Sequence, residues 1–597
     1  MPTTHFRPTC VRGLRGRAFV FARRARLAAL LGLLVIPADA SAQIQQHLDL
    51  RVPMRDGVEL SANLWLPNGS GPHPTVLVRT PYIKANERYP QLGKQYAERG
   101  YAFIVQDARG RGDSDGSFDF FFADGEDGYD TIEWIARQPW SNGRVGMVGG
   151  SYLATVQWLA AREGARNLVC MIPQAPGGDY FDELPYIGGA WLMKWSLDWI
   201  NGTSGRTAQG PVMGVTDWDA VYAHRPLITM DDAMGRDMPL YNDFLNHPTR
   251  DAYWDRILFE DEDFAGIDLP ILVFTGWFDA DQPGTMRYWE GMRDHSPGAD
   301  KQHIIIGPWD HGQAISGGAL SLGEFRFTPE SVVDVQATHM DFFDYCLGGK
   351  RSTADLPTAR VYLTGSNEWR EFDAYPPAEM EPQSLYLSSR GGANSLAGDG
   401  RLAWGPPGEE PPDQYTYDPQ NPVPSDIGGA AQGIDQRPIE RRHDVLVYTS
   451  DVLDSPVEII GAVEAIIHAA TDGLDTDFTA KLVDVQPDGR ALKLGWWDAA
   501  AIRARYRNGF EAEELLTPGQ EEEYRIKLGH IGHTFLPGHR IRLEVSSSAY
   551  PFFAPNPNTG NPVATDTEWR VAQQTVFHDA ARPSRLVLPV MPRRVIP

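Results

Sequence analysis

A serine follows directly on a strand-like segment that ends in two glycines. Residues 145–152 read VGMVGGSY, which places Ser151 between Gly150 and a stretch with helical spacing. A strand that turns tightly into a helix holds a serine hydroxyl above the sheet, and small residues are needed where the backbone is crowded. Ser151 is therefore a candidate nucleophile for acyl transfer. The strict G-x-S-x-G pattern is not met, because Leu153 occupies its last position, and a helix N-cap is the competing interpretation.

A carboxylate and a histidine follow at the ends of two later strand-like segments. Residues 269–274 (LPILVF) lead into TGWFD, which ends at Asp279, and residues 303–306 (HIII) lead into GPWDHG, which contains His311. A serine nucleophile needs a base and an orienting carboxylate, in the chain order Ser, Asp, His in sheets of this kind. The order predicts a triad of Ser151, Asp279 and His311, with an ordinary histidine pKa of about 6 to 7.

The segments that must position these residues alternate between two patterns. Near-continuous hydrophobic runs are typical of strands that are buried on both faces. Such runs occur at residues 73–78, 101–105, 144–148, 168–172, 269–274 and 303–306. Apolar residues recur at helical spacing over residues 127–137 and 152–162. This alternation predicts a doubly wound α/β domain formed by residues 43–178 and 264–350.

Two other regions have a different pattern. Residues 179–263 are rich in Trp, Asp, Tyr and Gly and contain no clean strand. We expect them to form a mostly helical cap over the carboxyl edge of the sheet, where ligands of open α/β folds bind. Residues 355–597 alternate short strand-like segments with Gly, Pro and Asn turns, which is typical of a β-sandwich or jelly roll.

The composition narrows the class of protein. Of the 597 residues, 42% are hydrophobic and 11% are aromatic, which is enough for a large core. The formal net charge of −25 argues against nucleic acid as a partner, because proteins that bind it carry clustered Lys and Arg.

The first 42 residues have the layout of a secretory signal peptide. They contain seven arginines, a short apolar run at residues 27–37 and an A-x-A site before Gln43. The apolar run is too short to span a bilayer, and no later run reaches the length of about 18 apolar residues that would be needed. We expect an exported, periplasmic or secreted protein that is cleaved near Ala42 and Gln43 and has no membrane anchor.

Two cysteines, Cys170 and Cys346, remain after that cleavage. They could pair with each other. Cys170, however, lies in the apolar run NLVCMIP, where a buried and unreactive thiol is the commoner outcome. The pattern favours a free buried thiol and excludes a disulfide scaffold.

Further motifs resemble a known family. The matching segments are RTPY at residues 79–82, DARGRGDS at 107–114, DGYDTIEW at 127–134, QPWSNG at 138–143, and the triad-bearing GGSYLA, GWFD and GPWDHG. This set resembles the serine hydrolases that include cocaine esterase, α-amino acid ester hydrolases, glutaryl-cephalosporin acylases and X-Pro dipeptidyl peptidases. The resemblance covers nearly the whole mature chain. It implies an α/β-hydrolase domain with a helical cap, a C-terminal jelly roll, and hydrolysis through an acyl-enzyme.

The resemblance also implies roles for single residues. Ser151 would be the nucleophile, His311 the general base and acid, and Asp279 the carboxylate that orients it. The oxyanion hole would combine the backbone N–H of Tyr152 with the phenol of Tyr82, a neutral donor suited to a developing negative charge.

Further residues are candidates for substrate binding. Asp281 stands beside the triad, and Asp182 and Glu183 fall in the expected cap, so that together they could bind a substrate ammonium group. Trp191 and Trp277 are candidates for the pocket wall. Trp191 recurs with Trp195 and Trp199 at a spacing that is also typical of helix packing.

The sequence favours a small-molecule ester or amide as substrate and predicts neither a cofactor nor a metal. The acidic runs at residues 124–127 and 260–263 do not complete a calcium loop, and no zinc signature occurs. Two alternatives stay open. One is a hydrolase or acyltransferase directed at a free amine, such as an amino acid ester hydrolase or an X-Pro dipeptidyl peptidase. The other is a noncatalytic binding protein. The oligomeric state is open, and a homo-oligomer is compatible with the sequence.

Overall fold

A computed structural model describes residues 44–592, apart from Ser70, residues 208–216, Thr353 and residues 426–432. The expected signal peptide at residues 1–42 lies outside the described residues. Among the described residues, no helix combines the length and the apolar composition needed to cross a membrane.

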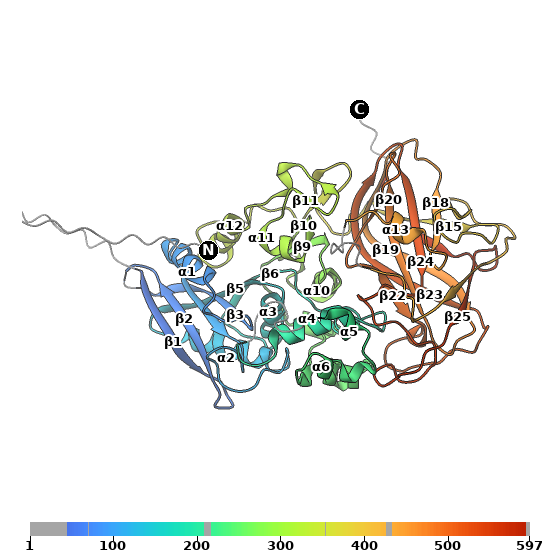
Figure 1. The fold of residues 1–597 in the computed structure, drawn as a ribbon. Coiled ribbons are helices and arrows are strands. Elements are labelled where there is room, and N and C mark those ends of the chain that lie inside the picture. The colour runs from blue at the N-terminus through green and yellow to red at the C-terminus, as the bar shows by residue number, and fades with distance from the viewer. Residues whose placement is uncertain (1–43, 70, 208–216, 353, 426–432, 593–597) are drawn as a thin grey trace, which may run out of the picture. The chain divides into compact units, whose positions relative to one another are not determined.

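In the described part of the chain, ten strands form one sheet (Figure 1). In order across the sheet they are β1 (Gln45–Pro53), β2 (Glu59–Leu66), β4 (Ala102–Asp107), β3 (His73–Thr80), β5 (Ser141–Gly150), β6 (Leu168–Gln174), β9 (Ile271–Phe278), β10 (Gln302–Asp310), β13 (Ala359–Leu363) and β14 (Glu368–Phe372). The strands from β4 to β13 pair in parallel, whereas β1, β2 and β14 join antiparallel at the two edges. The six hydrophobic runs are confirmed as the parallel strands β3, β4, β5, β6, β9 and β10.

One segment that was expected in the C-terminal β-sandwich pairs with this sheet. The alternating segment Ala359–Leu363 was expected to belong to the C-terminal β-sandwich, which was placed from residue 355 onward. Instead it is β13, which pairs in parallel with β10 and forms a hairpin with β14. Short alternating strands occur both in sandwiches and at the antiparallel edge of a mostly parallel sheet, so their pattern alone does not assign them to either domain.

Helices cover both faces of this sheet. On one face α1 (Arg88–Glu98) meets α12 (Val335–Cys346), where the rings of Tyr96 and Phe343 lie 6.1 Å apart. On the other face α2 (Asp124–Ala136) packs closely on α3 (Tyr152–Arg162), and a Cβ atom on Gly128 would lie 2.7 Å from that of Ala160. The remaining elements of this domain are α10 (Gln282–His295), α11 (His311–Ser316), β11 (Ser321–Leu322), β12 (Phe325–Arg326), η2 (Ala299–Lys301) and η3 (Pro329–Ser331).

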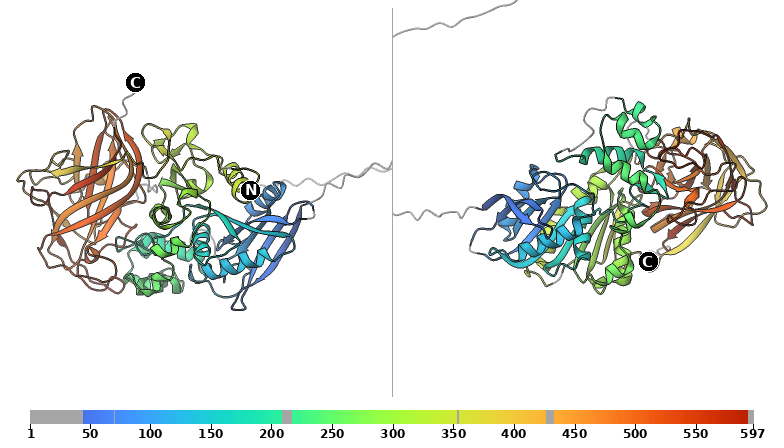
Figure 2. Two further views of the ribbon diagram at one scale, coloured as in Figure 1. Left: turned by 180° about the vertical axis from the view of Figure 1, so that it is seen from behind. Right: turned by 90° about the horizontal axis from the view of Figure 1, so that it is seen from below.

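The insertion between β6 and β9 is mostly helical, as expected for a cap. Its elements are β7 (Tyr186–Ile187), β8 (Ala190–Trp191), α4 (Met193–Thr203), α5 (Trp218–Tyr222), η1 (Leu227–Thr229), α6 (Met230–Ala233), α7 (Pro239–Asn246), α8 (Ala252–Asp255) and α9 (Asp261–Ala265). Figure 2 shows these helices, in green, beside the strands of the C-terminal segment. Backbone hydrogen bonds join the two, from Ile228 to Ala564 and from Arg250 to Phe510.

The C-terminal segment is a β-sandwich. Its elements are β15 (Glu381–Ser388), β16 (Arg401–Ala403), β17 (Asp413–Tyr417), α13 (Arg437–Glu440), β18 (Leu446–Ser450), β19 (Val457–Thr471), β20 (Asp477–Val485), β21 (Ala491–Lys493), β22 (Ala500–Arg503), η4 (Ala504–Tyr506), β23 (Glu522–Phe535), β24 (Arg540–Ser546), β25 (Ala572–Phe577) and β26 (Arg585–Val590). β19 pairs with β23, and β20 pairs with β24. β20 and β23 contact each other without pairing, as expected for strands from two packed layers.

The two cysteines form a disulfide, which corrects the expectation of a free buried thiol. Cys170 on β6 and Cys346 at the end of α12 have Cα atoms 6.1 Å apart, within the range that a disulfide bridges. The apolar run around Cys170 shows that the residue is buried, but it carries no information about α12, which contacts β6 from 176 residues further along the chain.

Candidate active site

Ser151 occupies a strained turn between β5 and α3. Its backbone has φ 61° and ψ −130°, a conformation that non-glycine residues rarely adopt. The Ser151 N–H donates to the carbonyl of Gln174 on β6 at 2.9 Å. Crowding explains the preceding glycine, because a Cβ atom on Gly150 would lie 2.5 Å from Ile315 of α11. The sequence thus folds into the tight turn that lifts a serine hydroxyl out of the sheet.

His311 follows the end of β10, three strands along the sheet from β5, and is bonded to a buried carboxylate. Its Nδ1 is 2.8 Å from Oδ1 of Asp279, which is fully buried. The other Asp279 oxygen accepts from the Thr275 hydroxyl at 2.7 Å, and Oδ1 also accepts from the Asp281 N–H at 3.0 Å. These bonds fix the carboxylate, and through it the plane of the imidazole ring.

The loop that carries the two aspartates is attached to the C-terminal β-sandwich. The Gln282 amide donates to the carbonyl oxygens of Gly276 at 3.0 Å and His530 at 2.9 Å, and it accepts from the His530 N–H at 2.6 Å. Gln282 is fully buried. Its side chain is therefore a structural link to β23.

A second carboxylate, Asp281, changes the electrostatics of the histidine. Its Oδ2 lies 3.8 Å from His311 Nδ1, and its side chain is nearly buried. Burial disfavours the imidazolium, but the negative charges of Asp281 and Asp279 outweigh it and raise the pKa of His311 to about 9. Burial, opposed by His311 and assisted by Asp279, raises the pKa of Asp281 to about 7. The expected ordinary histidine pKa is therefore not what this environment produces.

Tyr82 and Tyr152 flank the serine with different groups. The Tyr82 phenol oxygen accepts from Trp199 Nε1 at 3.1 Å, and burial raises the pKa of Tyr82 although hydrogen bonding with Trp199 and Ser151 opposes the rise. The phenol of Tyr152 is directed away from the serine, because it donates to the Phe120 carbonyl at 2.7 Å and bonds to Asp124. The backbone N–H of Tyr152 lies at the start of α3, directly after Ser151.

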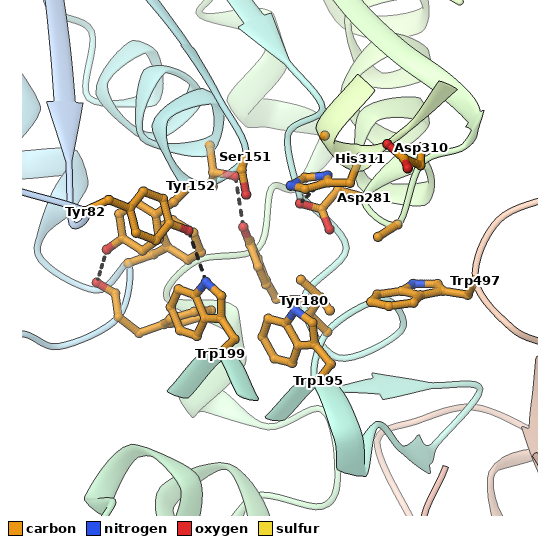
Figure 3. A pocket seen from close by; sticks show the side chains of 16 residues that line it. Tyr82, Ser151, Tyr152, Tyr180, Trp195, Trp199, Asp281, Asp310, His311 and Trp497 are labelled. Atoms are coloured by element: carbon orange, nitrogen blue, oxygen red, sulfur yellow. Dashed lines mark hydrogen bonds and ion pairs between the residues drawn. The ribbon is translucent and has the colours of Figure 1, made fainter. Parts of the chain in front are cut away.

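These groups share one cavity of about 460 Å³, drawn in Figure 3. Ser151 and His311 lie on one side of it, and three tryptophans lie across from them. Its lining is mainly aromatic and comprises Tyr82, Phe120, Phe121, Tyr152, Tyr180, Trp195, Trp199 and Trp497, with Ser151, Thr155, Leu184, Ala280, Asp281, Asp310, His311 and Gly312. Such a cavity suits a mostly apolar substrate with one reactive polar group.

The structure brings only one of the three candidate acids into this cavity. Asp281 lines it, but Asp182 pairs with Lys527 at 2.8 Å and accepts from the Gly188 N–H at 2.7 Å. The Glu183 carboxylate is buried and accepts three backbone N–H bonds, from residues 178, 179 and 284. Burial and the charge of Asp281 raise the pKa of Glu183. Asp182 and Glu183 are therefore already bonded to other groups of the protein.

Neither of the two candidate tryptophans lines the cavity. Trp191 is fully buried on β8, and Trp277 is buried with its Nε1 bonded to the Tyr362 carbonyl at 2.5 Å. Trp277 also fills the space above Gly532, where a Cβ atom would lie 2.3 Å from the indole. Both side chains are therefore part of the packed core.

Trp497 is a lining residue that the sequence did not single out. It comes from the β-sandwich, and its backbone has φ 48°. Buried Lys493 holds the preceding loop, because its Nζ donates to the carbonyl oxygens of Leu494, Gly495 and Trp496 at 3.3, 3.1 and 3.2 Å. The adjacent residues Trp496 and Trp497 were the available sequence signal. They come more than 300 residues after Ser151, so the sequence did not indicate that Trp497 lies in the same cavity.

The two acidic runs are helix starts. Residues 124–127 open α2, and residues 260–263 open α9 with a capping box. Among the described residues, no group of three or more His, Cys, Asp or Glu side chains is placed to hold a metal ion.

The sheet, the helical insertion and the serine turn define an α/β-hydrolase. The sequence matches the X-Pro dipeptidyl-peptidase (S15 family) over residues 56–313 and the X-Pro dipeptidyl-peptidase C-terminal non-catalytic domain over residues 352–587. It is 34% identical over 579 residues to cocaine esterase of Rhodococcus sp. (strain MB1 Bresler), covering 91% of this chain and 98% of that protein. The chain belongs to the S15 family of serine hydrolases.

Two solved structures are similar over nearly the whole chain. One is an α-amino acid ester hydrolase, with a TM-score of 0.81 and 27% identity, covering 94% of this chain and 99% of that one. The other is an aminopeptidase from the marine sediment archaeon Thaumarchaeota archaeon, with a TM-score of 0.81 and 27% identity, covering 92% and 96%.

The charge of Asp281 gives a direct titration test. Asp281→Asn removes a negative charge beside the imidazole, so the pKa of His311 should fall from about 9 by about one unit or more. The protonated fraction of His311 at neutral pH then decreases. NMR titration of the labelled histidine ring measures this shift, and an unchanged pKa in the variant would contradict the assignment of Asp281 as its cause.

The three hydrogen bonds of Lys493 give a second test. Lys493→Met removes the donor shared by three carbonyls and should release Trp497, raising KM for an aryl ester about 10-fold with a smaller change in kcat. Lys481→Met is the control, because this lysine is also buried but bonds to Gln436 and lies 3.6 Å from the Glu544 carboxylate. In a Trp497→Ala background, Lys493→Met should raise KM no further. An equal rise in both lysine variants would mean that general destabilisation is responsible.

Proposed function

We propose that the protein hydrolyses carboxylic esters through an acyl-enzyme formed on Ser151. The observation that carries the proposal is the hydrogen bond between Asp279 and His311, because His311 lines the same cavity as the strained Ser151. The strand-end positions of the three residues, in the chain order expected of this fold, support the same assignment.

In this mechanism His311 is the proton carrier. In the fraction of the protein whose imidazole is neutral, it takes the proton of Ser151 as the serine oxygen attacks the ester carbonyl carbon, and it returns the proton to the departing alcohol oxygen. Water then attacks the acyl carbon with His311 again as base, which releases the acid and restores the serine. Asp279 keeps the imidazole ring in position and stabilises its positive charge.

The negative oxygen of the tetrahedral intermediate needs donors beside the serine. We assign the backbone N–H of Tyr152 and the phenol O–H of Tyr82 to this task. The raised pKa of Tyr82 supports the assignment, because the phenol stays a neutral donor at the pH of the reaction. The Nε1–H of Trp199 donates to the phenol oxygen and so helps to fix its position.

An amine-directed activity is the second candidate, and Asp281 in the cavity favours it. The ester reading is preferred because Asp182 and Glu183 are occupied by Lys527 and by backbone N–H groups. An α-amino acid ester hydrolase and an aminopeptidase are among the similar structures, so free-amine substrates require a test.

We also propose that the chain is exported after cleavage near Gln43. The layout of residues 1–42 and the Cys170–Cys346 disulfide support this, since disulfides persist in oxidising compartments. N-terminal sequencing of the protein from a periplasmic or culture fraction should begin at Gln43, and an intact N-terminus would reject export.

For the domains, we propose a cap at residues 179–263 and a hydrolase domain that extends through β14.

The triad predicts strongly non-additive effects. Ser151→Ala and His311→Ala should each lower kcat by several orders of magnitude, and the double variant should be little worse than either alone, because both residues serve one step. Labelling by a fluorophosphonate should be lost in Ser151→Ala. Steady-state kinetics on p-nitrophenyl esters checks the first point. Multiplying losses in the double variant would mean that the two residues do not act as a unit.

Matched substrates separate ester hydrolysis from amine recognition. If Asp281 binds an ammonium group, an α-amino ester should be preferred about 10 to 100-fold over its N-acetylated twin, and Asp281→Asn should erase the preference. The ester reading predicts no such preference. Nitroanilides of X-Pro dipeptides extend the comparison to the peptidase alternative, and their cleavage at rates near those of the esters would overturn the preference for esters.

A further inference from the structure

The segment DARGRGDS at residues 107–114 begins at the carboxyl end of β4, and none of its residues lines the catalytic cavity. β4 pairs in parallel with β3, which leads into Pro81 and Tyr82. The carboxyl ends of parallel neighbours lie at the same edge of a sheet. There the Ala108 N–H donates to the Thr80 carbonyl at 2.8 Å, so the segment runs beside the loop that carries the Tyr82 phenol.

The carboxylate of Asp107, the last residue of β4, fastens this loop after Tyr82. It is fully buried, and its Oδ1 accepts from the Lys84 N–H at 2.5 Å. Its Oδ2 accepts from the Asp113 N–H at 3.1 Å. Gly112 permits this tight turn, because it has φ 52° and a Cβ atom there would lie 2.3 Å from Oδ2 of Asp107. Asp107 therefore joins its own turn to the Tyr82 loop.

Arg111 fastens the same loop before Tyr82. Its side chain is fully buried, and its Nε donates to the carbonyl of Pro81, which directly precedes Tyr82, at 2.8 Å. Between the two attachments Ile83 has φ 69°, which a β-branched residue adopts only where its surroundings enforce it. One segment thus holds the backbone on both sides of the phenol, through Arg111 and Asp107.

The guanidinium of Arg111 also bonds to the helix whose tryptophan contacts the phenol. Its Nη1 donates to the carbonyl of Thr203, the last residue of α4, at 2.6 Å, and bonds to the Gly205 carbonyl as well. The last carbonyls of a helix lack partners within it and carry partial negative charge, so a cation is favourable there. The Thr203 hydroxyl donates to the Trp199 carbonyl at 3.0 Å, and Trp199 Nε1 donates to the Tyr82 oxygen at 3.1 Å.

We propose that Arg111 is a positioning residue for the oxyanion hole: its hydrogen bonds to the Pro81 carbonyl and to the end of α4 set the place of the Tyr82 phenol beside Ser151. This role rests on the proposed function, in which the phenol stabilises the negative oxygen of the intermediate. Arginine suits the role because its planar guanidinium donates in several fixed directions, whereas the ammonium of lysine is a point charge on a flexible stem.

The positive charge of Arg111 offers a competing explanation. Burial raises the pKa of Tyr82, and the charge of Arg111 is among the influences that oppose this rise. The charge alone would then make the phenol a better donor, whichever way the guanidinium points. Arg111→Lys separates the two explanations, because it keeps the charge but does not reproduce the fixed pattern of bonds.

A cycle of four full-length proteins tests the placement: the wild type, Tyr82→Phe, Arg111→Lys and the double variant, each assayed for kcat and KM on a p-nitrophenyl ester. Tyr82→Phe should lower kcat about 100 to 1,000-fold, as expected for the loss of one oxyanion donor. Arg111→Lys should lower kcat about 10 to 100-fold with KM nearly unchanged, because a misplacement of about 1 Å has an effect of that size. In the Tyr82→Phe background, Arg111→Lys should lower kcat no further.

Three results would overturn the proposal. Wild-type kcat in Arg111→Lys would show that the charge is sufficient. An equal loss of kcat in the presence and absence of the Tyr82 hydroxyl would show that Arg111 does not act through the phenol. An unchanged kcat in Tyr82→Phe would mean that there is no catalytic phenol to position. An acyl adduct on Ser151 reports separately on the proposed function: where it forms, these results reject only the role of Arg111, and where it does not form, both fail.

Two further variants control for folding. Arg503→Lys changes an arginine that is also buried but bonds to Asp477 within the β-sandwich, so it should lower Tm and leave the effect of Tyr82→Phe on kcat unchanged. A loss of kcat in Arg503→Lys as large as that in Arg111→Lys would assign the effect to general destabilisation and reject the proposal. Arg111→Met, which carries no charge to bury, replaces the lysine variant in the cycle if circular dichroism shows that the latter is unfolded, and an equal loss in both Tyr82 backgrounds again rejects the role.

Discussion

The crowded turn at Ser151 is the constraint on which the remaining structure depends. A non-glycine residue at φ 61° costs about 1–3 kcal/mol and persists only where its surroundings enforce it. Here the bond from the Ser151 N–H to Gln174 and the contact of Ile315 with the glycine before the serine enforce it. Since Ile315 belongs to the short helix that begins at His311, the same contact ties the serine turn to the histidine.

Electrostatics around the histidine follow from the way its two carboxylates are held. Asp279 is saturated by hydrogen bonds from Thr275, Asp281 and His311, whereas Asp281 keeps an oxygen close to the ring at the cavity wall. With the pKa of His311 raised to about 9 and that of Asp281 raised to about 7, the pair carries a proton at neutral pH. The β-sandwich supports this arrangement, because Gln282 links the aspartate loop to β23 and Lys493 orders the loop that places Trp497 opposite the serine.

Much of this architecture can be predicted from local sequence, because buried parallel strands and the residues at their carboxyl ends leave local signals. Such signals located β5, β9 and β10, and hence Ser151, Asp279 and His311. The membership of β13 in the first sheet and the Cys170–Cys346 bond depend instead on contacts between distant segments. The same holds for the pocket. In the sequence, Asp182 is a candidate to bind a ligand, but in the structure it pairs with Lys527, which lies 345 residues later. Trp497 lines the cavity although it belongs to the C-terminal domain.

The central claim is that the strained serine carries the acyl group during turnover. Rapid quenching of the wild-type protein with a p-nitrophenyl ester, followed by proteolysis and mass spectrometry, tests it without any substitution. The account predicts a burst of about one nitrophenol per chain and an acyl adduct on the peptide that contains Ser151. An adduct on another residue, or turnover with neither a burst nor an adduct, would contradict the account.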